Sequence, residues 1–286
     1  MLSRRDTLLL GSAVSVLALL PGAAFAGAGL PAAVAAIEKR VGGRLGVAVL
    51  DTGTGRLDGH RADERFALCS TFKFLAAAFV LARADEGLED LSRPVAIPAA
   101  GLVHHSPFTE RHAGGTMSVA DLCEAVMVIS DNTAANLLLD GFGGPAGLTA
   151  WLRALGDPVT RLDRAEPALN EAAPGDPRGT TSPAAMIATM RRLLLGDVLA
   201  PASRRRLTDW LIANRTGDRR IRAGLPAGWR VGDKTGSGRN GATNDIAILW
   251  PPGRAPILAA VYLTETRAAP EARDAAHADV ARLISR

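Results

Sequence analysis

The segment Leu45-Gly-Val-Ala-Val-Leu50 is followed directly by Asp51-Thr-Gly-Thr-Gly55. The first segment contains no polar side chain and the second is rich in turn-forming residues, which together predict a strand turning into a second strand. Near the other end of the chain, apolar segments predict further strands at Trp229–Thr235, Ala242–Trp250 and Ile257–Thr264. Because strands occur at both ends, we expect one sheet built from both termini.

Between these segments the apolar residues recur with a helical period. The predicted helices are Phe72–Ala84, Ser118–Ser130, Thr133–Leu139, Ala146–Leu155, Ser182–Leu195 and Ala202–Ile212, with two more at Pro31–Val41 and Pro270–Ser285. We therefore expect an α/β fold of the α+β sandwich type, in which the antiparallel sheet from both termini carries an inserted all-helical lobe. In a single domain, 27–286, the lobes would span about 27–61 plus 213–286 and about 62–212, with the functional site in the cleft between them.

The composition indicates a globular protein, since 48% of the 286 residues are hydrophobic and 22% are charged. A formal net charge of +4 is small for this length, so nucleic acid is not an expected partner. Among 33 basic residues only Lys39, Lys73 and Lys234 are lysines. Because the chain otherwise uses arginine, a retained lysine indicates a need for a compact ammonium whose pKa can be lowered.

The N-terminus has the pattern of a signal peptide over residues 1–26. Arg4 and Arg5 precede an apolar run that extends through Leu20, and a small-residue cleavage site ends at Ala26. The adjacent arginines resemble a twin-arginine signal, and a plain Sec signal is the alternative. No later segment approaches the roughly 18 apolar residues of a membrane span. We therefore expect a periplasmic or secreted monomer without membrane attachment after cleavage.

Cys69 and Cys123 are the only cysteines. An exported protein can form disulfides, but free cysteine also commonly behaves as a small core residue. The apolar surroundings of Cys123 favour two separate buried thiols over a bridge.

Ser70-Thr-Phe-Lys73 pairs a hydroxyl with an amine. On a helix beginning near Ser70, the side chain three residues later lies on the same face. A serine hydroxyl is a poor nucleophile until a base removes its proton, and a desolvated lysine can be neutral often enough to do so. An arginine could not, so the sequence predicts Ser70 as nucleophile with Lys73 beside it.

Three further motifs contain polar residues that suit the same chemistry. Ser130-Asp-Asn132 offers a hydroxyl and an amide, and it could also cap the helix that follows. Lys234-Thr-Gly236, on a predicted strand, offers a charge for a carboxylate and a close backbone approach. Arg164-Ala-Glu-Pro-Ala-Leu-Asn170 lies in a long aperiodic segment, where Glu166 and Asn170 can hold a water between them.

These four motifs, in this order and along nearly the whole chain after the signal, resemble the class A serine β-lactamases. The resemblance implies hydrolysis of the β-lactam amide bond of penicillins and cephalosporins through a Ser70 acyl-enzyme. It also implies deacylation by water that Glu166 activates, with no cofactor and no metal. Residues 164–170 would belong to the family's Ω-loop. Either Lys73 or Glu166 can be the base for acylation.

The resemblance also implies a set of substrate-binding residues. They are His105, Asn132, Asn170, Arg220, Lys234, Thr235, Gly236 and Ser237. Ser130 would protonate the leaving nitrogen, and the backbone amides of Ser70 and Ser237 would form the oxyanion hole. Arg220 either supports the substrate carboxylate or is a surface arginine. His105 either stacks on substrate or is a solvated loop residue.

Two positions depart from the family. The family commonly pairs the arginine at position 164 with an aspartate where this chain has Gly179, so Asp163 or Asp176 must substitute or the loop is looser. Carbapenem-hydrolysing members have a cysteine where this chain has Gly238, which argues against carbapenem turnover.

Other classes of protein fit the motifs less well. A penicillin-binding D-alanyl-D-alanine carboxypeptidase or transpeptidase, or a non-hydrolysing β-lactam-binding relative, would not need Glu166 and Asn170. A zinc hydrolase is suggested by His104, His105 and His112, but no H-E-x-x-H motif is present. A G-x-G-x-x-G match at 236–241 runs into a predicted strand, where a dinucleotide site needs a helix.

Overall fold

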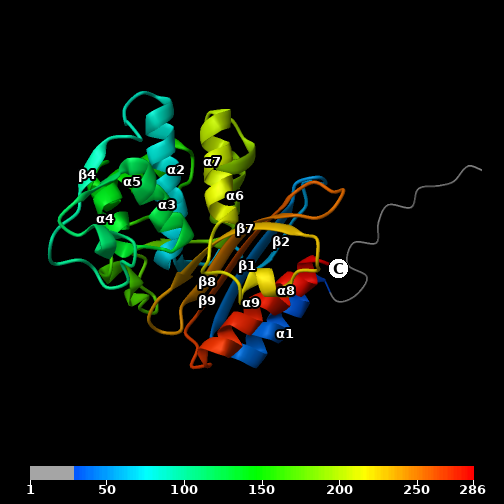
Figure 1. Ribbon diagram of the computed structural model, residues 1–286. Helices are drawn as coiled ribbons and strands as arrows, with labels where there is room; N and C mark the ends of the chain where they lie inside the picture. The colour runs from blue at the N-terminus through cyan, green and yellow to red at the C-terminus, as the bar shows by residue number, and fades with distance from the viewer. Residues whose placement is uncertain (1–28) are drawn as a thin grey trace, which may run out of the picture.

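A five-stranded antiparallel sheet forms the centre of the computed structural model, which describes residues 29–286. In spatial order its strands are β2 (Leu57–His60), β1 (Arg44–Asp51), β9 (Ile257–Thr264), β8 (Thr243–Trp250) and β7 (Arg230–Ser237). β1 pairs with β9 along its whole length, from Arg44 opposite Thr264 to Asp51 opposite Ile257. The expected sheet from both ends of the chain is confirmed (Figure 1).

Both faces of this sheet are buried, which explains why its strands are continuous apolar segments. α1 (Leu30–Val41), α9 (Pro270–Ile284) and the short α8 (Ile221–Gly224) lie on one face (Figure 1). In β1, Val47 and Val49 face the core shared with these helices. Ala48 and Leu50 face the core of the helical lobe instead. The sheet therefore separates two hydrophobic cores.

The helical lobe is inserted between β2 and β7 and lies beside the other face of the sheet (Figure 1). Its helices are α2 (Phe72–Asp85), α3 (Val119–Val128), α4 (Asn132–Asp140), α5 (Gly144–Ala154), α6 (Pro183–Leu195) and α7 (Pro201–Ile212). Ten of the fourteen residues of α2 are buried, as expected for a helix at the centre of a lobe. α6 packs against β1 and β9 and joins the lobe to the sheet.

The junction between α3 and α4 differs from the prediction, which extended the first helix to Ser130. α3 ends at Val128, and Ser130 has a left-handed backbone with φ of 63°. Asp131 caps α4 by accepting a hydrogen bond from the amide of Ala134. The capping role foreseen for the Ser-Asp-Asn motif is confirmed for Asp131, and Ser130 is left free for other contacts.

Two short ladders and several 3₁₀ turns were not predicted. β3 (Phe66–Ala67) pairs with β6 (Thr180–Thr181), and β4 (Pro94–Ala96) pairs with β5 (Thr116–Ser118). Segments of two or three residues are too short to show a period. The β3–β6 ladder nevertheless matters for the site, because it joins the chain before Ser70 to the end of the long aperiodic segment.

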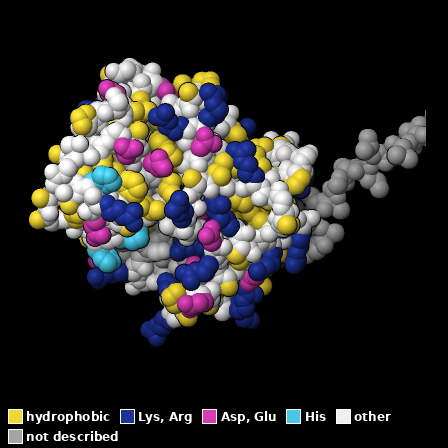
Figure 2. Space-filling model, viewed as in Figure 1, with side chains coloured by type: hydrophobic (Ala, Val, Ile, Leu, Met, Phe, Trp, Pro, Cys, Tyr) yellow, Lys and Arg dark blue, Asp and Glu magenta, His cyan; other side chains and the backbone are white. Residues whose placement is uncertain are grey.

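Cys69 and Cys123 are both free and buried, so the prediction of separate thiols is confirmed. Burial raises the pKa of the Cys69 thiol to about 12, which makes it a poor nucleophile. The predicted signal peptide lies outside the described residues. Within residues 29–286, no helix combines the length and apolar character that crossing a bilayer requires. Figure 2 shows basic and acidic side chains interspersed on one face of the molecule.

Candidate active site

A cleft of about 320 Å³ lies where the helical lobe meets β7. Its lining residues are Ser70, His105, Ser130, Asn132, Asn170, Thr216, Arg220, Thr235, Gly236 and Ser237. Nine of these ten were predicted from the sequence, and Thr216 was not. The other three predicted residues, Lys73, Glu166 and Lys234, are buried. The cleft therefore presents neutral polar groups and one arginine, with the remaining charges beneath its surface.

Ser70 lies in the 3₁₀ turn η1 (Cys69–Thr71), which continues directly into α2. The hydroxyl of Thr71 donates to the carbonyl of Leu68 at 2.7 Å and fixes this turn. The Ser70 hydroxyl donates to Glu166 Oε1 at 3.4 Å. The turn therefore holds the Ser70 hydroxyl oxygen next to a carboxylate that comes from a distant loop.

Lys73 follows on the first turn of α2 and is completely buried. Its ammonium donates to Asn132 Oδ1 at 2.6 Å and to the carbonyl of Ser130 at 2.7 Å. It also lies 3.2 Å from Glu166 Oε1. Burial lowers the pKa of Lys73 below its usual value of 10.5, although the charge of Glu166 opposes this shift. The amine can therefore lose its proton more easily than a solvated lysine can.

Glu166 is held by a residue that sequence reasoning missed. Asn136 of α4 donates to the backbone carbonyl of Glu166 and accepts from its backbone amide, both at 2.9 Å. The side-chain amide of Asn170 donates to Glu166 Oε2. Asn170 Oδ1 is buried and has no hydrogen-bond partner within residues 29–286. Asn136 gave no signal in the sequence because it lies within an apolar helical pattern.

The Ser130 hydroxyl lies between two ammonium groups, 3.3 Å from Lys73 Nζ and 3.1 Å from Lys234 Nζ. Lys234 projects from β7 and also donates to the carbonyl of Thr235. Burial lowers the pKa of Lys234 to about 7, and the charge of Lys73 acts in the same direction. The left-handed backbone at Ser130 places its hydroxyl where both lysines can reach it.

Arg220 belongs to the cleft, so the alternative of a surface arginine is wrong. Its side chain is only 12% exposed and forms an ion pair with Asp274 at 2.9 Å. Its guanidinium donates to the carbonyls of Gly236 and Asn244 and, at 2.8 Å, to the hydroxyl of Ser237. These bonds hold a cation at the edge of β7, beside Thr235.

His105 lines the same cleft and is exposed. Its ring Nε2 lies 3.2 Å from the carbonyl of Ile129, and its own carbonyl accepts from the amide of Asn132. The loop that contains His105 is therefore tied to the α3–α4 junction. Whether the ring stacks on a substrate stays a prediction.

The loop 160–181 contains the carboxylate partners of Arg164, which the sequence alone did not identify. Arg164 forms ion pairs with Glu171 and with Asp176, the latter at 3.4 Å. Asp163 pairs with a different arginine and accepts from the amide of Gly179 at 2.8 Å. Of the two alternatives, the structure therefore has the substitute pair with Asp176, and Arg164 is not left without a carboxylate. Gly179 has φ of 63°, a conformation that other residues adopt at a cost.

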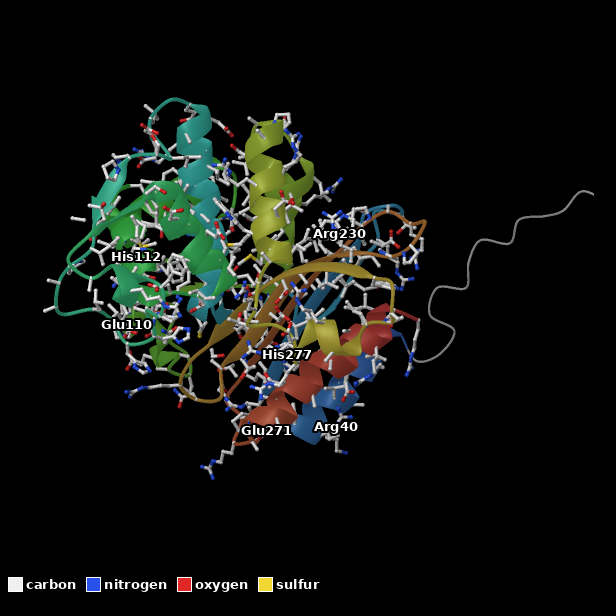
Figure 3. The ribbon with its side chains drawn as sticks, in the orientation of Figure 1. Arg40, Glu110, His112, Arg230, Glu271 and His277 are labelled. Atoms are coloured by element: carbon white, nitrogen blue, oxygen red, sulfur yellow. The ribbon has the colours of Figure 1, made fainter. Side chains whose placement is uncertain are left out.

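The structure gives the local arrangement of the histidines considered as zinc ligands and of the G-x-G-x-x-G match. Within residues 29–286, no group of three His, Cys, Asp or Glu side chains is arranged to hold a metal ion. Figure 3 shows His112, one of the three histidines considered as zinc ligands, in the helical lobe, where its ring Nδ1 lies 3.0 Å from the carbonyl of Phe108. Gly236–Gly241 forms the end of β7 and the turn into β8, with no helix to receive a phosphate.

The site contains a serine beside a buried lysine and a loop carboxylate, and a second lysine that shares the Ser130 hydroxyl with the first. These are the groups expected in a serine hydrolase that works through an acyl-enzyme. Comparison with known proteins shows which family of serine hydrolases the chain belongs to. A family model described as the β-lactamase enzyme family matches residues 29–286.

The relatives are named β-lactamases. β-Lactamase L2 of Stenotrophomonas maltophilia is 53% identical over 253 residues, which cover 88% of this chain and 84% of that relative. β-Lactamase CTX-M-8 of Citrobacter amalonaticus is 49% identical over 252 residues, covering 88% of this chain and 87% of that relative. The structure of the class A β-lactamase of the last common ancestor of Gram-negative bacteria is 66% identical, with a TM-score of 0.88, and the match covers 90% of this chain and 98% of that one.

The chain belongs to the class A β-lactamase family. It is a serine hydrolase of β-lactams and confers resistance to them. The carboxypeptidase or transpeptidase alternative is not favoured, because the relatives are named β-lactamases and the matches cover 84% and 87% of their lengths.

Proposed function

We propose that the protein hydrolyses penicillins and cephalosporins with Ser70 as nucleophile and Glu166 as the base for deacylation. Ser70 Oγ attacks the β-lactam carbonyl carbon, and its proton passes to the hydrogen-bonded pair of Lys73 and Glu166. The lowered pKa of Lys73 and the 3.4 Å contact between Ser70 and Glu166 support this assignment. Ser130 then gives a proton to the ring nitrogen as the C–N bond breaks, and Lys234 or Lys73 replaces that proton.

In deacylation, Glu166 removes a proton from a water molecule that attacks the Ser70 ester. The ester C–O bond breaks, the proton that Glu166 took from the water passes to Ser70 Oγ, and the opened β-lactam leaves as a carboxylate. The observation that carries the proposal is that Glu166 Oε1 lies within 3.4 Å of Ser70 Oγ and 3.2 Å of Lys73 Nζ. The unpartnered, buried Asn170 Oδ1 beside Glu166 supplies a second acceptor for that water.

Substrate binding follows from the walls of the cleft. Lys234, Thr235 and Arg220 would bind the carboxylate, and Asn132 would bind the side-chain amide. The amides of Ser70 and Ser237 would stabilise the oxyanion. A Cβ at Gly236 would come within 3.1 Å of the Ser70 amide nitrogen, so glycine lets β7 lie close to the turn that contains Ser70.

We also propose that residues 1–26 are a signal peptide of the twin-arginine type and that the processed protein works as a periplasmic or secreted monomer. Arg4, Arg5 and the cleavage pattern ending at Ala26 support export.

Steady-state hydrolysis of nitrocefin by the purified protein tests the proposed function. Ser70→Ala should abolish turnover while the melting temperature changes little, because within residues 29–286 this hydroxyl makes a single hydrogen bond, at 3.4 Å. Ser92→Ala, at an exposed serine, is the matched control and should keep full activity. Substantial turnover by Ser70→Ala would overturn the assignment of the nucleophile.

A further inference from the structure

An apolar groove of about 620 Å³ lies on the molecule away from the active-site cleft. One wall is the β1–β2 hairpin, with Leu50 and Leu57, and the other is α6, with Ile187, Ala188 and Leu195. α6 packs against β1 of this hairpin. The groove is larger than the cleft of about 320 Å³ and falls within the usual size range of small-molecule sites.

The rims of this groove expose hydrophobic side chains that are otherwise rare on the surface. Within residues 29–286, only Leu57, Leu88 and Leu195 are exposed large hydrophobics, at 52%, 60% and 41%. Two of these three line the groove. Scattered single leucines need no explanation, but two on opposite walls of one concave apolar surface indicate a binding site.

Two arginines complete the lining. Arg191 and Arg192 are exposed, and neither forms an ion pair with a carboxylate within residues 29–286. None of the lining residues is acidic. The groove therefore combines an apolar channel with two uncompensated positive charges, which complements a molecule with a hydrocarbon chain and an anionic headgroup.

We propose that the groove binds one medium-chain fatty carboxylate, with the hydrocarbon chain between α6 and the hairpin and the carboxylate on Arg191 and Arg192. Between Ala184 and Leu195, α6 rises about 16 Å at about 1.5 Å per residue, which suits a chain of this class. The concave shape favours a single inserted chain over a flat lipid surface. The site is separate from the catalytic cleft, so its occupancy does not depend on the proposed function.

The test is isothermal titration of the purified protein with sodium dodecanoate below its micelle concentration. We expect saturable binding of one molecule per protein, with nitrocefin turnover unchanged at saturation. Dodecyl maltoside has the same chain length and a neutral headgroup, and it should bind about tenfold more weakly because it lacks the charge-assisted contact.

Variants separate the two parts of the site. Arg191→Gln with Arg192→Gln should weaken dodecanoate binding about tenfold and leave dodecyl maltoside binding unchanged. Leu57→Asn with Leu195→Asn should weaken both ligands. The matched controls are Arg205→Gln with Arg206→Gln on α7, and Leu88→Asn, which remove equivalent charges or an exposed leucine outside the groove. Nitrocefin turnover verifies that each variant is folded.

Three results would overturn the proposal. The first is no saturable binding, or binding equally affected by the control variants. The second is competitive inhibition of nitrocefin turnover, which would place dodecanoate in the cleft. The third is that monomeric dodecanoate does not bind, while the protein sediments with phosphatidylglycerol vesicles or dimerises as its concentration rises. In that case the substitutions at Leu57 and Leu195 would abolish the sedimentation or the dimerisation. That result would assign the groove to a membrane surface or to a second copy.

Discussion

The Ser130 hydroxyl has an ammonium group on each side, from Lys73 and from Lys234. Burial lowers the pKa of both lysines, and the charge of Lys73 lowers the pKa of Lys234 further. Arginine would keep its charge in the same place. This explains why a chain that otherwise uses arginine has lysine at these two positions.

The lowered pKa of Lys234 leads to a prediction for the pH dependence of substrate binding. Its pKa is lowered to about 7, so the side chain is charged below that pH and neutral above it. If its charge binds the substrate carboxylate, kcat/KM for benzylpenicillin should fall by up to about tenfold per pH unit on the alkaline side. Lys234→Arg keeps the charge, so its alkaline limb should move to higher pH. Identical alkaline limbs for both proteins would show that another group titrates.

Arg220 offers a second prediction at the level of one side chain. Arg220→Ala should raise KM for benzylpenicillin about tenfold or more, because a charge-assisted contact to the carboxylate is lost. Arg219 pairs with the same Asp274 at 3.4 Å but is 80% exposed, so Arg219→Ala is the matched control. Steady-state kinetics that change equally in both variants would mean that Asp274, rather than the substrate contact, accounts for the effect.

Most of the residues that the sequence identified lie in short motifs whose chemistry requires particular side chains. Ser70, Lys73, Glu166 and Lys234 belong to this group, and the structure brings them together. Asn136 acts through the backbone of Glu166, and this role has no motif of its own. Residues that position others across the fold become visible only once the elements are placed.

In the proposed mechanism, deacylation depends on the loop from 160 to 181, which contains Glu166. It is fixed at one end by the β3–β6 ladder, in its middle by Asn136, and across its base by the ion pairs of Arg164. A loop of this length would otherwise have considerable freedom, and a base displaced by about 1 Å can cost about a hundredfold in rate.

Asp176 tests how this loop is closed. Its side chain is only 12% exposed, whereas Glu171, the other partner of Arg164, is 52% exposed. Exposed ion pairs contribute little to stability, so the pair of Arg164 with the less exposed Asp176 should contribute more than its pair with Glu171. Asp176→Asn should therefore lower the melting temperature by about 2–4 °C, the effect of about 1 kcal/mol in a domain of this size. It should also slow penicillin turnover, while Glu171→Gln changes both quantities little. Thermal scans and kcat values that do not distinguish the two variants would contradict this account of the loop.

Element prediction succeeded where segments were long and periodic. Ile257–Thr264 was predicted with its observed bounds, because a strand buried on both faces is apolar throughout. The four-residue α8 was missed, since such a segment cannot show a helical period. The error at Ser130 has a different cause: apolar residues continue to Ile129, but the left-handed backbone that ends the helix is not encoded by their spacing.

At the scale of the whole molecule, strands from the two ends of the chain lie side by side in one sheet, as β1 and β9 show. The sheet can close only when the C-terminal strands are available. Export through the twin-arginine route, which the pattern at Arg4 and Arg5 predicts, would deliver the protein already folded.

The export route is tested by Arg4→Lys with Arg5→Lys. We expect precursor of full length to accumulate in the cytoplasm and periplasmic nitrocefin activity to fall at least about tenfold, because twin-arginine export requires both arginines. Immunoblots of fractionated cells measure this directly. Normal processing and periplasmic activity of the variant would indicate Sec export.

The central claim is that Glu166 activates the water that frees Ser70 from its acyl-enzyme. Glu166→Gln leaves Ser70 and Lys73 in place, so acylation continues more slowly while deacylation loses its base. The most direct measurement is the intact mass of this variant after incubation with benzylpenicillin, with Ser70→Ala as the control. The account predicts a persistent increase of one penicilloyl group on Glu166→Gln and none on Ser70→Ala. Continued turnover by Glu166→Gln without a persistent adduct would contradict it.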